Sequence, residues 1–322
     1  MDMEEIVSVI KESNLIGITF HQSPDGDSLG SSTALLQGLE SMGKKAYIMS
    51  KEEVSDTFSY LYGSDSIGTV SDVMEGTDLV VVLDCGDVKR INANIDFQNR
   101  DYKIVNIDHH MSNEGYGDVN YVSVKSAAVG EIVYDILTLA GVKITKSIGE
   151  SIYTSLLTDT SSFKHSNTTR KTHEVAGAVI ESGVNFNEIQ RRIFEDKDFN
   201  KVKFYGELIN TISLKYNGKI AFMQINEKSL SKCDLENIDS SEVIHFGTMI
   251  KGVEVVALFK EAKDGVKVSL RSRAVVDVSK VAEMFGGGGH MRAAGFFCDG
   301  SLEEVEISVL KILENELKNN EK

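Results

Sequence analysis

The sequence of 322 residues contains no tryptophan, a single proline and only three cysteines. Cys85, Cys233 and Cys298 lie far apart and form no CxxC pair, which argues against a disulfide framework and against a cysteine-rich zinc site. Because unpaired cysteines are typical of reducing compartments, we expect a cytoplasmic protein. The chain also lacks any run of about 18 apolar residues, so no membrane helix is expected.

Basic residues are also fewer than acidic ones. The sequence has 34 lysines and arginines and 49 aspartates and glutamates, which gives a formal net charge of −15. Long nucleic acid requires a broad basic surface, so a protein that coats it is not expected. The acidic N-terminus lacks the positive start of a signal peptide. This charge remains compatible with a small phosphorylated ligand in a locally basic pocket and with bound divalent cations.

The first half of the chain alternates short apolar runs with segments of helical spacing. The apolar runs lie at 16–20, 45–50, 78–84 and 102–108, and the helical segments at 29–42, 127–141, 147–159 and 173–183. This alternation predicts an α/β domain over 1–185 with a doubly wound, mainly parallel sheet. The apolar face of 127–141 has two interpretations, core packing or a homodimer contact.

The pattern changes after a charged, amphipathic segment at 186–212, which we interpret as a helical connector. Asn217-Gly218 and Asp264-Gly265 each stand between strand-like runs and predict two hairpins. Ser301 and Glu304 form a capping box before a long helix. Residues 213–322 are therefore predicted to form a smaller mixed-sheet α/β domain.

Carboxylates and imidazoles follow the predicted strands where each strand ends, as in the stretch HQSPDGDSLG at 21–30. Ligands of open α/β sheets bind beyond these carboxyl ends. Mixed aspartate and histidine ligands suit divalent ions such as Mn²⁺, Co²⁺ or Zn²⁺, and their number exceeds the needs of one ion. Two ions about 3.5–4 Å apart are common in phosphoester hydrolysis. The candidates are His21, Asp25, Asp27, Asp84, Asp108, His109 and His110 after the strands, together with Asp159 at the end of a predicted helix.

Each candidate taken alone has a plainer explanation. Asp27 can be a turn or N-cap residue, Asp84 can cap the next segment, and Asp159 can accept a hydrogen bond at a helix end. His109 and His110 can be a satisfied core pair. The recurrence of such groups at successive strand ends favours the metal site.

A second unusual stretch, FGGGGHMRAAG, occupies 285–295. Consecutive glycines allow close approach of a ligand and expose N–H groups to anions, although a flexible turn would use them too. Arginine is the usual bidentate phosphate ligand, and Arg271 and Arg273 alternate along the preceding strand. The predicted substrate-binding residues are Arg271, Arg273, Gly287, Gly288, Gly289, His290 and Arg292.

HQSPDGDSLG, VVLDCGD, NIDHH and LLTDTSSF, in this order, resemble the four motifs of the DHH phosphoesterase superfamily. SLRSR and FGGGGHMRAAG resemble the associated C-terminal domain. Together these motifs span nearly the whole chain. The layout is most similar to the bifunctional oligoribonuclease and phosphoadenosine phosphatase group, which degrades very short RNA and dephosphorylates 3′,5′-phosphoadenosine phosphate (pAp).

The resemblance implies two divalent ions, Mn²⁺ above all, with Mg²⁺ or Co²⁺ as alternatives, and attack of a metal-activated water on phosphorus. It assigns His21, Asp25 and Asp84 to the first ion. It assigns Asp27, Asp84, His109 and Asp159 to the second. His110 would face the scissile phosphate, and Asp108 would orient a histidine.

Two other functions remain open at this point. A phosphodiesterase of the linear dinucleotide pApA or of cyclic di-AMP would use the same metal residues, since only the substrate-side loops differ. The loop after Asp159, with Lys164 and His165, departs from the family pattern. The sequence therefore leaves the substrate preference undecided. A non-catalytic nucleotide-binding regulator would lack some metal ligand, whereas this sequence has every expected one.

Overall fold

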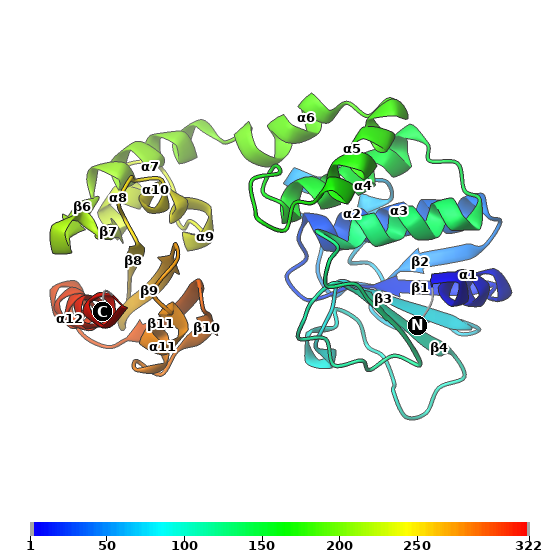
Figure 1. Ribbon diagram of the computed structural model, residues 1–322, viewed down its shortest axis with the longest axis horizontal. Coiled ribbons are helices and arrows are strands. Elements are labelled where there is room, and N and C mark those ends of the chain that lie inside the picture. Colours follow the sequence, from blue (N-terminus) through cyan, green and yellow to red (C-terminus); the bar gives the residue numbers. More distant parts are fainter. Residues whose placement is uncertain (1–2, 321–322) are drawn as a thin grey trace. The chain divides into compact units, whose positions relative to one another are not determined.

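The structure is a computed structural model that describes residues 3–320, and it forms two compact units (Figure 1). The division lies between Asp196 and Lys197, inside the segment predicted as a connector. Among the described residues no helix is both long and apolar enough to cross a membrane.

The first unit is built on a five-stranded sheet in which all neighbouring strands are parallel. The predicted parallel α/β fold is confirmed, and so are its four predicted strands. The short edge strand β5 was not predicted, because its four residues show no apolar run. In the order β2-β1-β3-β4-β5, the strands are β2 (Lys45–Ile48), β1 (Leu15–Thr19), β3 (Leu79–Leu83), β4 (Lys103–Asp108) and β5 (Val119–Val122).

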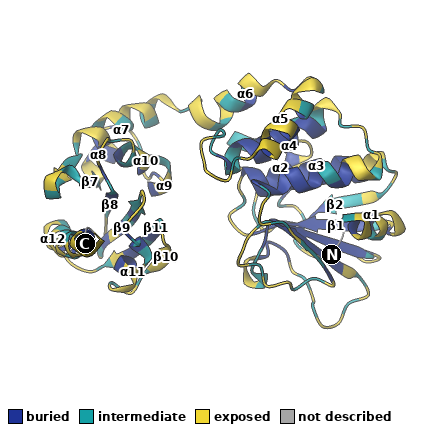
Figure 2. Cartoon of the chain, in the orientation of Figure 1, coloured by how far each residue is buried: buried dark blue, intermediate teal, exposed yellow. Residues whose placement is uncertain are grey.

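The two faces of this sheet are covered differently. Leu79 and Val81 of β3 belong to the same apolar cluster as the helices, whereas Val80 and Val82 belong to a cluster with residues from the loops of 49–116. Both faces are thus buried, which explains the continuous apolar run of β3 (Figure 2). The helices are α1 (Met3–Glu12), α2 (Gly26–Ser41), α3 (Val129–Ala140), α4 (Lys146–Asp159) and α5 (Arg170–Glu181).

The apolar face of α3 packs into this core, with Val133 and Ile136 buried and Leu139 exposed. Core packing therefore accounts for the apolar spacing of the helix.

The spacing of the segment 186–212 predicts one helix, but the structure divides this segment. It contains α6 (Phe186–Gln190), a π-helical turn (Arg191–Glu195) and α7 (Phe199–Asn210). Asp196 and Asp198 are extended, with ψ of 96° and 143°. Aspartate has a low helix propensity, and two aspartates in close succession stand where the helix is interrupted.

The second unit contains a six-stranded mixed sheet, as predicted. Asn217 and Gly218 have positive φ in the first hairpin, and the second hairpin turns at residues 263–264, between the paired Ala262 and Gly265, one residue earlier than predicted. The predicted capping box of Ser301 and Glu304 is present. The strands, in the order β10-β11-β9-β8-β7-β6, are β10 (Gly288–His290), β11 (Ala293–Cys298), β9 (Gly265–Ser272), β8 (Val255–Ala262), β7 (Ile220–Ile225) and β6 (Ser213–Lys215).

Two apolar clusters cover opposite faces of the second sheet. One includes residues of α11 (Val278–Glu283) and α12 (Leu302–Asn320) and reaches from β7 to β11. The other includes residues of α7, α8 (Glu227–Ser231) and α9 (Ser240–Val243), with α10 (His245–Thr248) beside them, and reaches only β7 and β8. The second face is therefore covered over part of its width.

Close packing of α2 against α4 predicts a contrast between two glycine-to-alanine substitutions. A Cβ at Gly30 would lie 2.5 Å from the Ser151 carbonyl oxygen and 2.9 Å from the Ser155 nitrogen, whereas nothing lies within 4 Å of a Cβ at Gly177. We expect Gly30→Ala to cost about 1–3 kcal/mol and Gly177→Ala to stabilise the protein by about 0.5–1 kcal/mol. Urea unfolding of both variants measures the difference. Equal stability of the two would contradict the packing argument.

Candidate metal centre

The candidate metal centre lies at the carboxyl edge of the first unit's sheet. Because β1, β3 and β4 are parallel, the residues that follow them meet at one edge. His21 follows β1, Asp84 follows β3, and Asp108 ends β4 before His109 and His110. The start of α2 and the end of α4 add carboxylates to the same place, namely Asp25, Asp27 and Asp159.

The structure brings these side chains into groups whose potential ligand atoms all lie within 4.8 Å of one another. One group is His21, Asp25 and Asp84, in which His21 Nε2 lies 3.3 Å from Asp84 Oδ2. A second group is Asp27, His109 and Asp159, in which His109 Nε2 lies 3.7 Å from each carboxylate.

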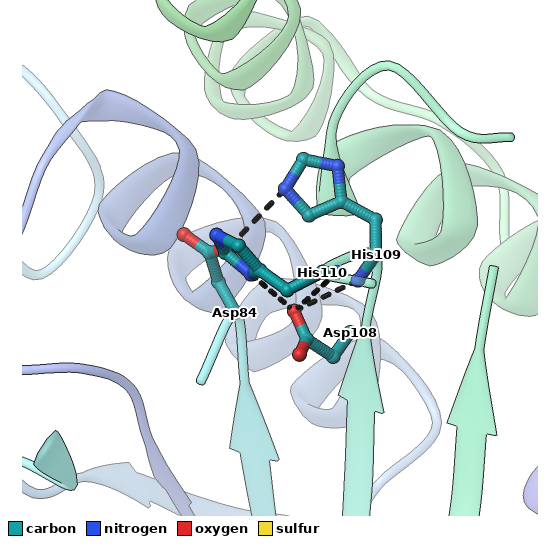
Figure 3. Close-up of side chains that lie close together, drawn as sticks. All are labelled: Asp84, Asp108, His109 and His110. Carbon is teal, nitrogen blue, oxygen red and sulfur yellow. Dashed lines mark hydrogen bonds and ion pairs between the residues drawn. The ribbon is translucent and has the colours of Figure 1, made fainter. Parts of the chain in front are cut away.

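Asp84 connects the two groups, because its Oδ1 lies 3.5 Å from His109 Nε2 (Figure 3). Its side chain is buried, with 2% of the residue exposed, yet Oδ1 has no hydrogen-bond partner. Its backbone adopts a left-handed conformation with φ of 52°. A buried carboxylate oxygen is normally paired, and strained backbone is often found at functional sites. A cation would satisfy the oxygen that the chain leaves without a hydrogen bond.

Charge crowding at this edge also fits a cation site. Burial, together with the charges of Asp84 and Asp159, raises the pKa of Asp27 well above its usual value. Burial raises the pKa of Asp159 to about 6, with the attraction of His109 opposing it and the charge of Asp84 adding to it. Burial lowers the pKa of His21, but hydrogen bonds to Asp25 and Asp84 outweigh this effect and raise the pKa to about 10. The histidines therefore supply only part of the positive charge that these carboxylates need, and oxygen and imidazole donors fit divalent ions.

Asp27 is held by three donors from two other helices. The backbone nitrogen of Val129 donates to its Oδ2 at 2.9 Å, and that of Gly130 to its Oδ1 at 3.3 Å, both from the first turn of α3. Ser155 Oγ of α4 donates to Oδ1 at 2.5 Å. Sequence reasoning missed Ser155, although it stands one helical turn before Asp159 and so faces the same side of α4.

Asp108 is engaged by hydrogen bonds on both oxygens. His110 Nδ1 lies 2.7 Å from Oδ1, and Asn113 Nδ2 donates to Oδ2 at 2.6 Å. The same Asn113 nitrogen donates to Asn106 Oδ1 at 2.8 Å. Asp108 is therefore arranged to orient His110. Asn113 was also missed, because nothing in the sequence distinguishes it from an ordinary loop asparagine.

Asp25 has two roles in the structure. It is the N-cap of α2, because its Oδ1 accepts from the nitrogens of Asp27 and Ser28. The same oxygen lies 3.7 Å from His21 Nε2.

The predicted substrate residues lie in the second unit. Arg271 is on β9 and half-buried, and burial lowers the pKa of its guanidinium. Arg273 follows the end of β9 and donates to the Thr248 carbonyl, whereas Arg292 donates to the Val276 carbonyl. His290 ends the exposed strand β10.

The glycine stretch is not a free loop, because residues 288–290 form β10 against β11. A Cβ at Gly287 would lie 2.3 Å from the Gly295 oxygen, and one at Gly289 would lie 2.6 Å from the Ala293 oxygen. These glycines serve close contact with β11. Gly288 alone of the predicted three has open space where its Cβ would be.

Both units match models of known protein families. The model of the DHH family, N-terminal domain, matches residues 15–158, and that of the DHHA1 domain matches residues 217–319. The bifunctional oligoribonuclease and PAP phosphatase NrnA of Thermus thermophilus is 30% identical over 94% of this chain and 90% of its own length. The protein of the same name from Bacillus subtilis is 28% identical over 90% of this chain and 91% of its own.

A solved structure has the same fold along the whole chain. The crystal structure of an exopolyphosphatase-related protein from Bacteroides fragilis gives a TM-score of 0.86 and covers 98% of this chain and 95% of its own. Its sequence identity is 23%, so this likeness concerns the fold alone.

Asp159→Asn tests the cation site through stability. The ionised Asp159 destabilises the fold above pH 6, because burial raises its folded pKa to about 6 despite the ion pair with His109. Among residues 3–320, no hydrogen bond to its side chain is lost on substitution. In EDTA at pH 8 we therefore expect the variant to melt at or above the wild-type temperature. With Mn²⁺ at 100 times its Kd, the wild type should gain about 2.7 kcal/mol and the variant clearly less.

The control is Asp101→Asn, which removes an exposed loop carboxylate with the same change of charge. Equal stabilisation of Asp159→Asn and wild type by Mn²⁺ would show that Asp159 holds no metal. Differential scanning fluorimetry with and without the ion measures each case.

Proposed function

Because this chain belongs to the DHH family and carries a DHHA1 domain, we propose that it is a metal-dependent phosphohydrolase that degrades very short RNA to mononucleotides and dephosphorylates pAp. The observation that carries this proposal is the pair of ligand groups joined through Asp84. The relatives named for both activities, similar over 90% or more of this chain, support the choice of substrates.

The residues at the sheet edge fit two divalent cations, with Mn²⁺ as our first choice. His21, Asp25 and Asp84 would hold one, and Asp27, His109, Asp159 and Asp84 the other. Bound cations of this kind supply Lewis acidity, which polarises a phosphoryl oxygen and lowers the pKa of a water. The donor set contains no thiolate, which disfavours soft metals.

His110 is the residue placed to act on the substrate directly. Its Nδ1 is hydrogen-bonded to Asp108, and its side chain is 44% exposed, so Nε2 is the nitrogen left for a ligand. The hydrogen bond and the charge of Asp108 raise the pKa of His110. A protonated imidazole donates from Nε2 to a phosphate oxygen and can hand its proton to a leaving group. The hydrogen bond from Asn113 to Asp108 fixes the carboxylate that orients His110.

The second unit would bind the phosphate or terminal nucleotide of the substrate. Arg271 has no carboxylate within ion-pair distance among residues 3–320, although the charge of Asp239 acts on it. The guanidinium donates to the Leu270 carbonyl at 3.0 Å. A half-buried guanidinium without an ion pair gains much from a phosphate partner. His290 lies in the same row of the sheet, because Ala293 pairs with both residues.

A substrate panel tests the function. With Mn²⁺, we expect mononucleotides from an RNA dinucleotide and pentanucleotide and phosphate from pAp, and we expect Asp84→Ala to lose all turnover while remaining folded. Turnover confined to pApA or cyclic di-AMP would assign the protein to second-messenger degradation instead. A protein that binds nucleotide but turns over none of these substrates would contradict the phosphohydrolase itself.

His110 and Asn113 should affect catalysis rather than metal binding. We expect His110→Ala to lower kcat about 10²–10⁴-fold, and Asn113→Ala to lower it less, because Asp108 then loses one of its donors. The melting-temperature gain with Mn²⁺ should stay close to wild type in both. An unchanged kcat for His110→Ala would remove it from the mechanism, whereas a lost metal response would make it a ligand.

A further inference from the structure

The second unit's sheet exposes half of one face. Beyond β8, the side chains that point to the α9–α10 side of β9 and β11 are exposed or half-buried. We call this the open face and define it by Lys267, Ser269, Arg271, Ala293, Gly295 and Phe297. The neighbouring residues on each strand, such as Val268 and Phe296, are buried in the cluster on the opposite side.

Strand register arranges the open face in three rows. Phe297 pairs with Lys267, Gly295 with Ser269, and Ala293 with Arg271. Gly288 and His290 of β10 extend the second and third rows, because they pair with Gly295 and Ala293.

The rows differ in chemistry. The first row contains Phe297, which is 48% exposed, and its cross-strand partner Lys267. The absent side chain of Gly265 leaves room for the Phe297 ring, since a Cβ there would lie 2.9 Å from it. The middle row carries nothing larger than Ser269, and nothing lies within 4 Å of a Cβ at Gly288. The third row holds the cation Arg271.

The open face is basic, whereas the whole chain is acidic. The segments 265–274 and 286–298 contain no aspartate or glutamate, in a chain of net charge −15. Among residues 3–320 no carboxylate forms an ion pair with Lys267. The charge of Asp239 acts on Lys267 and Arg271, but this carboxylate also accepts hydrogen bonds from Ser241. The Glu254 carboxylate, at the end of this region, accepts from the backbone nitrogens of 274–276. Basic groups beside an aromatic ring suit the backbone and bases of a single strand.

We propose that the open face is the binding track for an oligoribonucleotide, on which Phe297 and Lys267 form a distal subsite that binds a nucleotide beyond the one held at Arg271 and His290. The ring of Phe297 stacks on a base, Lys267 neutralises a phosphate, and the small middle row lets the sugar-phosphate chain lie close to the sheet. This inference rests on the proposed function and adds a basis for recognising substrate length.

The spacing of the rows supports a second nucleotide. Arg271 and Lys267 are four residues apart on β9, which corresponds to about 13 Å along the strand. Stacked bases rise only about 3.4 Å per nucleotide in a duplex strand, so an occupant of both ends spans more than one nucleotide. A compact substrate such as pAp needs only the Arg271 end.

The test is a binding comparison that does not depend on turnover. Calorimetry in EDTA measures the affinity of an RNA trinucleotide and of pAp for the full-length wild type and for the double variant Phe297→Ala, Lys267→Gln. The control variant, Ile307→Ala with Lys311→Gln, makes the same change of charge and also truncates an exposed apolar side chain, but on α12, which packs on the opposite face.

We expect the open-face variant to bind the trinucleotide about tenfold more weakly and pAp within twofold of wild type, with the control unchanged for both. Unchanged trinucleotide affinity would overturn the proposal. Equal weakening for pAp would do so too, because Phe297 would then serve the first nucleotide. Absence of trinucleotide binding to wild type would also refute it.

Turnover with Mn²⁺ separates this inference from the proposed function. If wild type hydrolyses neither ligand, the proposed function fails, while the affinities in EDTA still decide whether the distal subsite exists. If both ligands are hydrolysed, kcat/KM of the open-face variant should fall for the trinucleotide and not for pAp.

Discussion

The mutual repulsion of buried carboxylates is the constraint on which the first unit depends. Asp27 and Asp84 are almost fully buried, and Asp159 lies beside the same histidine. Burial of like charges this close is unfavourable unless positive charge is supplied. The chain supplies only part of it, through histidines whose pKa values are raised. The parallel sheet, the start of α2 and the end of α4 hold the carboxylates in place against this repulsion.

Much of this arrangement follows from the sequence, because parallel strands deliver their last residues to one edge. The apolar run before Asp84 and the one before His109 each predicted a strand, and these strand ends were enough to bring Asp84 and His109 to the same edge. The supporting contacts could not be predicted. Ser155 acts through a contact with Asp27, which is 128 residues away in the sequence. Asn113 contacts Asp108 within the same loop region, five residues away, but a loop asparagine is not distinctive in its local context.

The second unit shows a different limit of sequence reasoning. The glycine stretch was interpreted as a ligand loop, whereas the structure uses Gly287 and Gly289 for close contact with β11. Composition alone does not separate a backbone that approaches a ligand from one that approaches a neighbouring strand. The open face was equally hidden, because the alternation of Lys267, Ser269 and Arg271 marks a polar face without telling which helices leave it uncovered.

The contact between Gly130 and Ser155 has a consequence for how this protein can evolve. A side chain at Gly130 would meet the Ser155 hydroxyl at 2.1 Å, and that hydroxyl is the one that holds Asp27. Substitutions that tighten the packing of α3 on α4 would therefore displace a predicted metal ligand. A substitution that stabilises the core at this interface would also change the position of Asp27. Selection for stability and selection for activity therefore act on the same helix interface and oppose each other there.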